Sequence, residues 1–177
     1  NAGTDASGNT LTIDDSEDTT NNQMTMTNGN RTGYTSVTET NQGDINYKGN
    51  YLQTDGSAGV NLKASKGNDD ITIAGVIADA HTLVEASEGD DDVTVTNTNT
   101  RVLNSLTSLT MKGGLGEDVI DASQSGFDVT IEGNQGDDVI FGSAYDDNLS
   151  GNEDNDLIAG GLGADKISGD EGQDILF

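Results

Sequence analysis

Apolar residues recur every nine positions along the last quarter of the chain. Residues 133–177 divide into five nine-residue units, GNQGDDVIF, GSAYDDNLS, GNEDNDLIA, GGLGADKIS and GDEGQDILF. Each unit begins with Gly, carries Asp at its sixth position and has an apolar residue at its eighth. Such a period predicts one structural module per unit, which buries its apolar side by stacking on its neighbours. We therefore predict an all-β fold, a parallel β-solenoid.

A longer repeat with the same turn precedes these units. Segments that begin at Val60, Thr82, Leu109 and Val129 share an apolar-x-apolar strand, a charged residue and a turn of the form (A/G)-x-x-G-x-D. The turn glycines are 22, 27 and 20 residues apart, and the spacing then settles to 18, which is two nine-residue units; they are Gly67, Gly89, Gly116 and Gly136. We expect one continuous solenoid whose rungs shorten toward the C-terminus.

The charged residue before each of these turns alternates in sign along the chain. Its four occurrences are Lys63, Glu85, Lys112 and Glu132. Equivalent positions of a parallel solenoid stack on adjacent rungs, where opposite charges attract each other. We therefore expect a ladder of alternating charges, with chance alternation as the other explanation.

The remaining boundaries follow from the pattern of strands and turns. Residues 1–58 are the least regular, with short alternating runs at 11–13, 24–26, 34–40 and 45–52 that are typical of strands. We assign 1–58 to an irregular β segment that caps the solenoid or makes an assembly contact. Residues 59–112 form the long-rung solenoid, and 113–177 form the regular C-terminal part. The run at 77–86 has some helical character, but its second half aligns with rung strands.

The charge of the chain narrows the possible partners. The 177 residues carry 32 acidic and 7 basic side chains, for a formal net charge of −25, and there is no proline. Either the chain is an acidic disordered tail, or its fold depends on cations. The regular spacing of Asp favours the second, because disorder needs no register. So acidic a surface repels nucleic acid and anionic membranes, and no run is long enough to insert into a bilayer.

Glycine-rich turns with recurring carboxylates present oxygen ligands to a cation. Calcium prefers carboxylate and carbonyl oxygens in flexible geometry, whereas cysteine is absent and His81 is the one histidine. A single histidine leaves little basis for a histidine-based catalytic triad and cannot form a multi-histidine zinc site. The motifs G-x-S-x-G and H-E-x-x-H do not occur. We predict several calcium ions and no enzymatic activity.

The units GGLGEDVID (113–121) and GGLGADKIS (160–168) resemble the G-G-x-G-x-D-x-U-x nonapeptide of the RTX, or repeats-in-toxin, family. The resemblance covers residues 113–177 well and only the turns of 59–112. It implies a C-terminal β-roll, in which the first six residues of a unit form a turn and the last three a strand. It also implies that each Ca²⁺ lies between turns two units apart, held by carbonyls and Asp side chains.

Carried onto this chain, the resemblance implies two columns of aspartates. Asp118, Asp138, Asp156 and Asp174 form one column, and Asp147 and Asp165 form the other, which Asp128 would join at a 19-residue step. Asp69 and Asp91 hold the same place upstream, although their turns begin with Ala. Tyr145 and Asp154 replace the fourth-position glycine. The implied turn glycines are Gly113, Gly116, Gly133, Gly136, Gly151, Gly160, Gly163, Gly169 and Gly172.

We expect an extracellular, calcium-dependent structural protein of a bacterial surface layer, adhesin or filament. The resemblance implies export through type I secretion in an unfolded state, and folding on calcium binding outside the cell. The last residues, 174–177, are either a C-terminal secretion signal or simply the strand of the last repeat. The expected partner is a second copy, bound head-to-tail or laterally, or a cell-surface glycan. The alternative is a C-terminal RTX secretion and folding module of a larger secreted enzyme or toxin. A third possibility is a carbohydrate- or ice-binding face built from the Thr-rich strands, which would require Thr at a constant period, whereas the steps between threonines are irregular.

Overall fold

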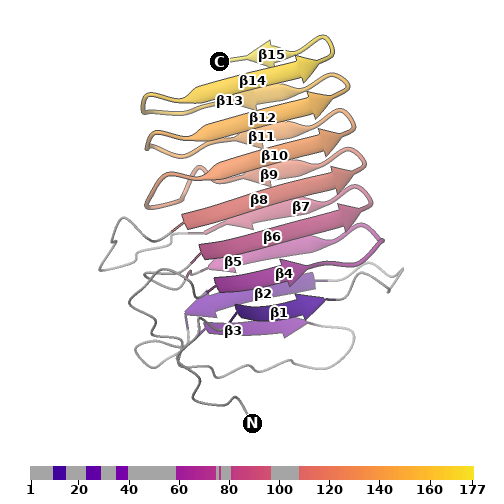
Figure 1. The fold of residues 1–177 in the computed structure, drawn as a ribbon, viewed down its shortest axis with the longest axis vertical. Coiled ribbons are helices and arrows are strands. Elements are labelled where there is room, and N and C mark those ends of the chain that lie inside the picture. Colours follow the sequence, from indigo (N-terminus) through magenta and orange to yellow (C-terminus); the bar gives the residue numbers. More distant parts are fainter. Residues whose placement is uncertain are drawn as a thin grey trace.

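The computed structural model describes residues 10–14, 23–28, 35–39, 59–74, 76, 81–96 and 108–177. Every element in these ranges is a β-strand, and the strands pile up along the long axis of the molecule in two facing sheets (Figure 1). No helix in this part of the chain is long and apolar enough to cross a membrane.

The first sheet contains seven parallel strands in chain order. They are β1 (Thr10–Asp14), β4 (Gly59–Lys63), β6 (His81–Glu88), β8 (Ser108–Leu115), β10 (Thr130–Gln135), β12 (Asn148–Glu153) and β14 (Lys166–Glu171).

The second sheet has eight strands and one departure from the parallel pattern. In order they are β3 (Thr35–Glu39), β2 (Gln23–Asn28), β5 (Asp70–Ala74), β7 (Asp92–Val95), β9 (Val119–Asp121), β11 (Val139–Phe141), β13 (Leu157–Ala159) and β15 (Ile175–Leu176). Only the pair β2–β3 is antiparallel. From β4 onward the chain alternates between the two sheets, so each rung is one strand of each. The predicted parallel β-solenoid is confirmed.

The strand register confirms the predicted continuity of the rungs. Lys63 pairs with Glu85, Glu85 with Lys112, and Lys112 with Glu132, which are the steps of 22, 27 and 20 residues expected from the turns. Later rungs keep the 18-residue step, because Glu132 pairs with Ser150 and Ser150 with Ser168. Two nine-residue units therefore make one turn of the solenoid.

The core is a thin stripe between the two sheets. Burial alternates along the strands, as in the pattern iBiBiBie of β8, because successive side chains point to opposite faces. Each sheet contributes one buried apolar residue per rung at the centre, and two of these rows meet in the interior. They are Leu62, Val84, Met111, Ile131 and Leu149 of the first sheet, and Ile71, Val93, Ile120, Ile140 and Ile158 of the second. This narrow core explains how a chain of 31% hydrophobic residues folds.

Strands predicted within 1–58 join the same two sheets. β1 pairs with β4, and β2 pairs with β5, so this segment extends the solenoid by parallel pairing. The expected strand at 45–52, and most of the extra residues of the long rungs at 75–81 and 97–108, lie outside the described residues. In 77–86, the described part belongs to strand β6, as expected for its second half. At the other end, Ile175 and Leu176 form the strand of the last repeat.

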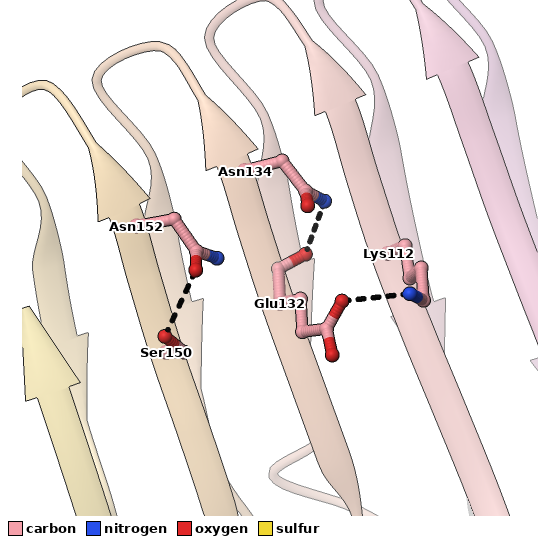
Figure 2. A network of polar contacts seen from close by, with 5 residues as sticks. All are labelled: Lys112, Glu132, Asn134, Ser150 and Asn152. Carbon is pink, nitrogen blue, oxygen red and sulfur yellow. Dashed lines mark hydrogen bonds and ion pairs between the residues drawn. The ribbon is translucent and has the colours of Figure 1, made fainter. Parts of the chain in front are cut away.

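The alternating charges lie in one row on the outer face of the first sheet. The Nζ atom of Lys112 lies 2.8 Å from Oε2 of Glu132, and Figure 2 shows this pair between β8 and β10. Both side chains are about a third exposed, so the pair contributes at most about 1 kcal/mol. The predicted stacking is confirmed, and Lys112 and Glu132 form an ion pair within the described part of this row.

Candidate metal centre

Six-residue turns stack along both edges of the solenoid. We call the turns that follow strands of the first sheet the first column; they end at Asp69, Asp91, Asp118, Asp138, Asp156 and Asp174. The second column follows strands of the second sheet and contains the turns that end at Asp147 and Asp165. Because the sheets keep their register, the final Asp of each turn lies over that of the turn before it.

A ladder of hydrogen bonds joins the aspartates of the first column. The backbone N–H of each Asp donates to Oδ1 of the Asp one rung further along, at 2.7–3.0 Å. The ladder runs without interruption from Asp69 to Asp174. It crosses steps of 22, 27, 20 and 18 residues, so the upstream turns belong to the same column despite their longer rungs.

The second oxygen of most of these carboxylates is buried and has no partner. Oδ2 of Asp91, Asp118, Asp138 and Asp156 makes no hydrogen bond in the structure. These side chains are at most 2% exposed. Buried polar atoms almost always find a partner, so four orphaned oxygens in a row are suited to bind a ligand. Their chemistry, an anionic oxygen without a donor, calls for a cation.

Burial also makes the charge on these groups costly. Desolvation is the largest influence on Asp91, Asp118 and Asp138 and raises the pKa of each to about 7, with neighbouring carboxylates adding to the effect. Burial raises the pKa of Asp147 and Asp156 as well. A bound cation would reverse this trend, because an adjacent positive charge favours the ionised carboxylate.

The first residue of each regular unit is Gly because Oδ2 of the Asp in the same turn occupies the space of a side chain. A methyl group added to Gly133 would lie 2.1 Å from Oδ2 of Asp138 and 2.9 Å from the carbonyl oxygen of Gly151. At Gly113 the same two contacts would be 2.1 Å, to Asp118, and 2.8 Å, to the carbonyl of Gly133. A carboxylate oxygen and a carbonyl oxygen of the next turn therefore approach the same glycine.

This oxygen-rich environment fits calcium. In the described residues, no three His, Cys, Asp or Glu side chains converge on one point, so a cation here would depend on backbone carbonyls as well as carboxylates. Calcium accepts such a mixture of ligands. The residues that would hold it are the aspartates with orphaned oxygens and the carbonyls of the turns on either side.

The fourth residue of the turn determines how closely successive turns can stack. Gly136 has a φ of +126°, and a methyl group there would lie 1.8 Å from the carbonyl oxygen of Gly116. Gly116, Gly163 and Gly172 are in the same situation. Asp154 replaces this glycine and keeps the left-handed conformation, with a φ of 75°. Tyr145, the other departure, is not among the residues with positive φ.

The second column departs from the expected arrangement at its start. Asp147 donates its N–H to Oδ1 of Asp165 at 3.0 Å, as predicted for a column. The predicted third member is misplaced: the register pairs Thr130 with Asn148, which sets Val129, and not Asp128, opposite Asp147. Val129 N–H donates to Oδ1 of Asp147 at 2.8 Å, while Asp128 is exposed one residue earlier. The segment 122–129 has two residues more than a regular turn, which a count of spacings cannot resolve.

Sequence reasoning missed two serines at the second position of their turns. Ser65 and Ser143 bond the Asp four residues later through both the backbone N–H and the hydroxyl. A serine four residues before a turn-closing aspartate is the signal that would have drawn attention to them.

Comparison with protein families agrees with this geometry. Residues 125–144 and 141–176 match the family model of the RTX calcium-binding nonapeptide repeat, which represents 4 copies of the unit. Neither a curated protein nor a solved structure was found to match the chain. Repeats of this family bind several calcium ions, and proteins that contain them are typically secreted, which indicates an extracellular location.

Proposed function

We propose, from the premise that this chain is an RTX calcium-binding repeat protein, that it is a structural module outside the bacterial cell. It serves a surface layer, an adhesin or a filament, and it folds when calcium becomes available after export. The observation that carries the calcium dependence is the row of four buried oxygens at Asp91, Asp118, Asp138 and Asp156. Without a cation, these groups oppose stacking by desolvation and mutual repulsion.

Coupling of metal binding to folding is the physical basis of this role. A cation that binds the stacked turns but not the extended chain stabilises the fold in proportion to its binding free energy. The net charge of −25 acts in the same direction, because repulsion favours the open chain until cations neutralise it. The fold is therefore much less stable where free calcium is scarce than where it is abundant.

Self-association is the partner class that we propose for the folded module. The outer face of the second sheet carries an apolar row, in which Val119 pairs with Val139 and Leu157 with Ile175, and Phe141 lies beside it. Val119 and Phe141 are 39% and 37% exposed. Exposed apolar rows of this kind favour contact with another surface. A cell-surface glycan is the other partner that this proposal includes, and catalysis has no part in it.

Calcium titration followed by imaging tests the proposal. We expect the β-sheet signal in circular dichroism and the melting temperature to rise with calcium and to fall again with chelator. Electron microscopy of the calcium-loaded protein should then show ordered assemblies. A chelated protein with unchanged signal and melting temperature would refute the calcium-dependent fold. Monomers only, at high protein and calcium concentration, would refute the assembly role and favour a secretion and folding module of a larger protein.

A further inference from the structure

The turns of the two columns fall into two classes that differ in the backbone conformation of their second residue. In six of them the second residue has a positive φ, between 70° and 135°; we call these open turns, and their second residues are Ser87, Gly114, Asn134, Asn152, Gly161 and Asp170. The turns 64–69 and 142–147 do not have a positive φ at this position. We call these two the serine-closed turns, because Ser65 and Ser143 are their second residues.

In a serine-closed turn, the Asp has its donors within the turn. Ser143 N–H donates to Oδ2 of Asp147 at 2.5 Å, and its hydroxyl lies 2.9 Å from Oδ1 and 3.0 Å from Oδ2. Ser65 bonds Asp69 in the same way, at 2.9 Å from the N–H and 2.7 Å from the hydroxyl to Oδ2. Neither aspartate has an orphaned oxygen.

In the open turns 133–138 and 151–156, the second side chain bonds a partner other than the Asp of its turn. Figure 2 shows Asn134 directed toward the backbone carbonyl of Glu132, to which its amide donates at 3.2 Å. Asn152, one rung along, accepts from the hydroxyl of Ser150 at 3.3 Å. Because the second residue of these two turns does not donate to the Asp, Oδ2 of Asp138 and Oδ2 of Asp156 have no donor. All four orphaned oxygens therefore lie in open turns, whereas Asp165 and Asp174, which end the other two open turns near the end of the stack, are half-buried.

Serine alone does not close a turn. Ser87 is also a second residue, yet its φ is 101° and Oδ2 of Asp91 is orphaned. The second requirement is the place in the column, because open turns rest on the turn beneath: a methyl group on Gly163 would lie 2.4 Å from the carbonyl oxygen of Tyr145. Beneath the turn 142–147 lies the irregular segment 122–129, with Val129 in the place of an Asp. The serine-closed turn therefore starts the second column.

We propose that calcium binds only at the open turns, so that the serine-closed turn 142–147 leaves the second column without an ion at Asp147. The ions occupy the gaps above Asp91, Asp118, Asp138 and Asp156 in the first column, whereas Ser143 takes the place of the ion at Asp147. The second column does offer the carbonyl of Gly160, which would lie 2.3 Å from a methyl group on Gly142. However, its carboxylate is already satisfied by neutral donors. This inference rests on calcium binding by the repeats, and it narrows the sites that the resemblance implies.

A matched pair of variants tests the asymmetry. Asp138→Asn and Asp147→Asn make the same chemical change at equivalent positions of the two columns. Native mass spectrometry at saturating calcium counts the ions bound to each folded protein. We expect one ion fewer for Asp138→Asn than for the unmodified protein, and an unchanged count for Asp147→Asn. Loss of one ion in both variants would overturn the proposal, whereas an unmodified protein that binds no calcium would instead refute the proposed function.

A third variant tests the role of the serine itself. Ser143→Gly removes the hydroxyl and allows the left-handed conformation that Gly161 adopts in the turn above. Oδ2 of Asp147 then loses its hydroxyl donor, and the open gap should accept one additional ion. Ser123→Gly, at an exposed serine in the irregular segment beneath, is the control and should leave the count unchanged. An unchanged count in Ser143→Gly would show that this serine does not exclude the ion and would overturn the role assigned to it.

Discussion

The backbone N–H of Asp138 donates to Oδ1 of Asp156, 3.0 Å away and 18 residues further along the chain. One oxygen of each carboxylate thus joins two rungs, while the other faces the gap that we assign to calcium. The same side chain holds the backbone in register and presents the metal ligand, so the loss of a single Asp affects both.

Replacement of Asp156 separates these two contributions. Asp156→Ala removes the acceptor of a buried N–H, whose cost is about 1–3 kcal/mol, together with the anionic ligand. Asp156→Asn keeps an acceptor and removes only the charge. Urea unfolding in calcium should show a larger loss of stability for Ala than for Asn, and in chelator only the Ala variant should remain less stable than the unmodified protein. Equal losses in both conditions would contradict the ladder role of Oδ1.

Substitution of Gly136 tests the close approach of successive turns. Gly136→Ala places a methyl group 1.8 Å from the carbonyl oxygen of Gly116 at a φ of +126°, so the turns must separate. We expect a loss of more than about 1 kcal/mol in the free energy of unfolding and weaker calcium binding. The exposed neighbour Gln135→Ala should change little. A variant as stable as the unmodified protein would show that the turns are not in contact.

The apolar stripe predicts a large effect of a single truncation. Leu149 is 1% exposed and pairs with Ile131 and Ile167 on the adjacent rungs. Leu149→Ala should cost about 2–5 kcal/mol, because the removed atoms leave a cavity between the sheets. Asn148→Ala, on the outer face of the same strand, is the control. Denaturant unfolding in calcium measures both, and a loss below about 1 kcal/mol for Leu149→Ala would argue against the stacked core.

The stability of the metal-free protein should decrease as the pH rises, which is the opposite of the usual effect of aspartates on stability. Burial raises the pKa of Asp91, Asp118 and Asp138 to about 7, whereas an unfolded Asp titrates near 4. The folded state therefore binds more protons between these values, and stability in chelator should fall as the pH rises from about 4 to about 7. Thermal unfolding across this range measures it. A stability that rises with pH under chelation would contradict the burial of these groups.

With calcium saturating, the same pH series should behave differently. A bound cation favours the ionised carboxylates, so stability should rise as the pH rises through this range and ligands lose their protons. The variant Asp138→Asn, in which one of the titrating groups is gone, should show a shallower fall in chelator than the unmodified protein. These two controls separate the titration of the column from general effects of charge.

The solenoid, the rung lengths and the aspartate column could be predicted because the repeat fixes them. Every turn carries its own Asp, and the step from Asp91 to Asp118 is visible in the sequence even at 27 residues. The place of Asp128 could not be predicted, because a spacing of 19 residues does not show which residue absorbs the irregularity. The structure puts Val129 there, as a buried residue directly before β10.

Rows of like residues on the outer faces of the sheets could not be predicted from the sequence, because the rungs differ in length. Thr25, Thr72 and Thr94 are separated by different numbers of residues, and the sequence gives no constant period for them. The register nevertheless places all three in one row, which continues to Asp121. The two conformations of the turns were equally inaccessible, because Ser65, Ser87 and Ser143 are the same residue at the same position. What differs is the neighbouring turn, which only the stacked structure reveals.

The constant 18-residue step between the last rungs has a consequence for how such a molecule changes in size. Glu132, Ser150 and Ser168 occupy one row, so each of these rungs offers the next the same template. Duplicating or deleting one whole step leaves every remaining partner in place, whereas an insertion of an odd number of residues within a strand moves the side chains that follow it to the opposite face. The length of the solenoid can therefore evolve by whole 18-residue rungs, while its cross-section stays the same.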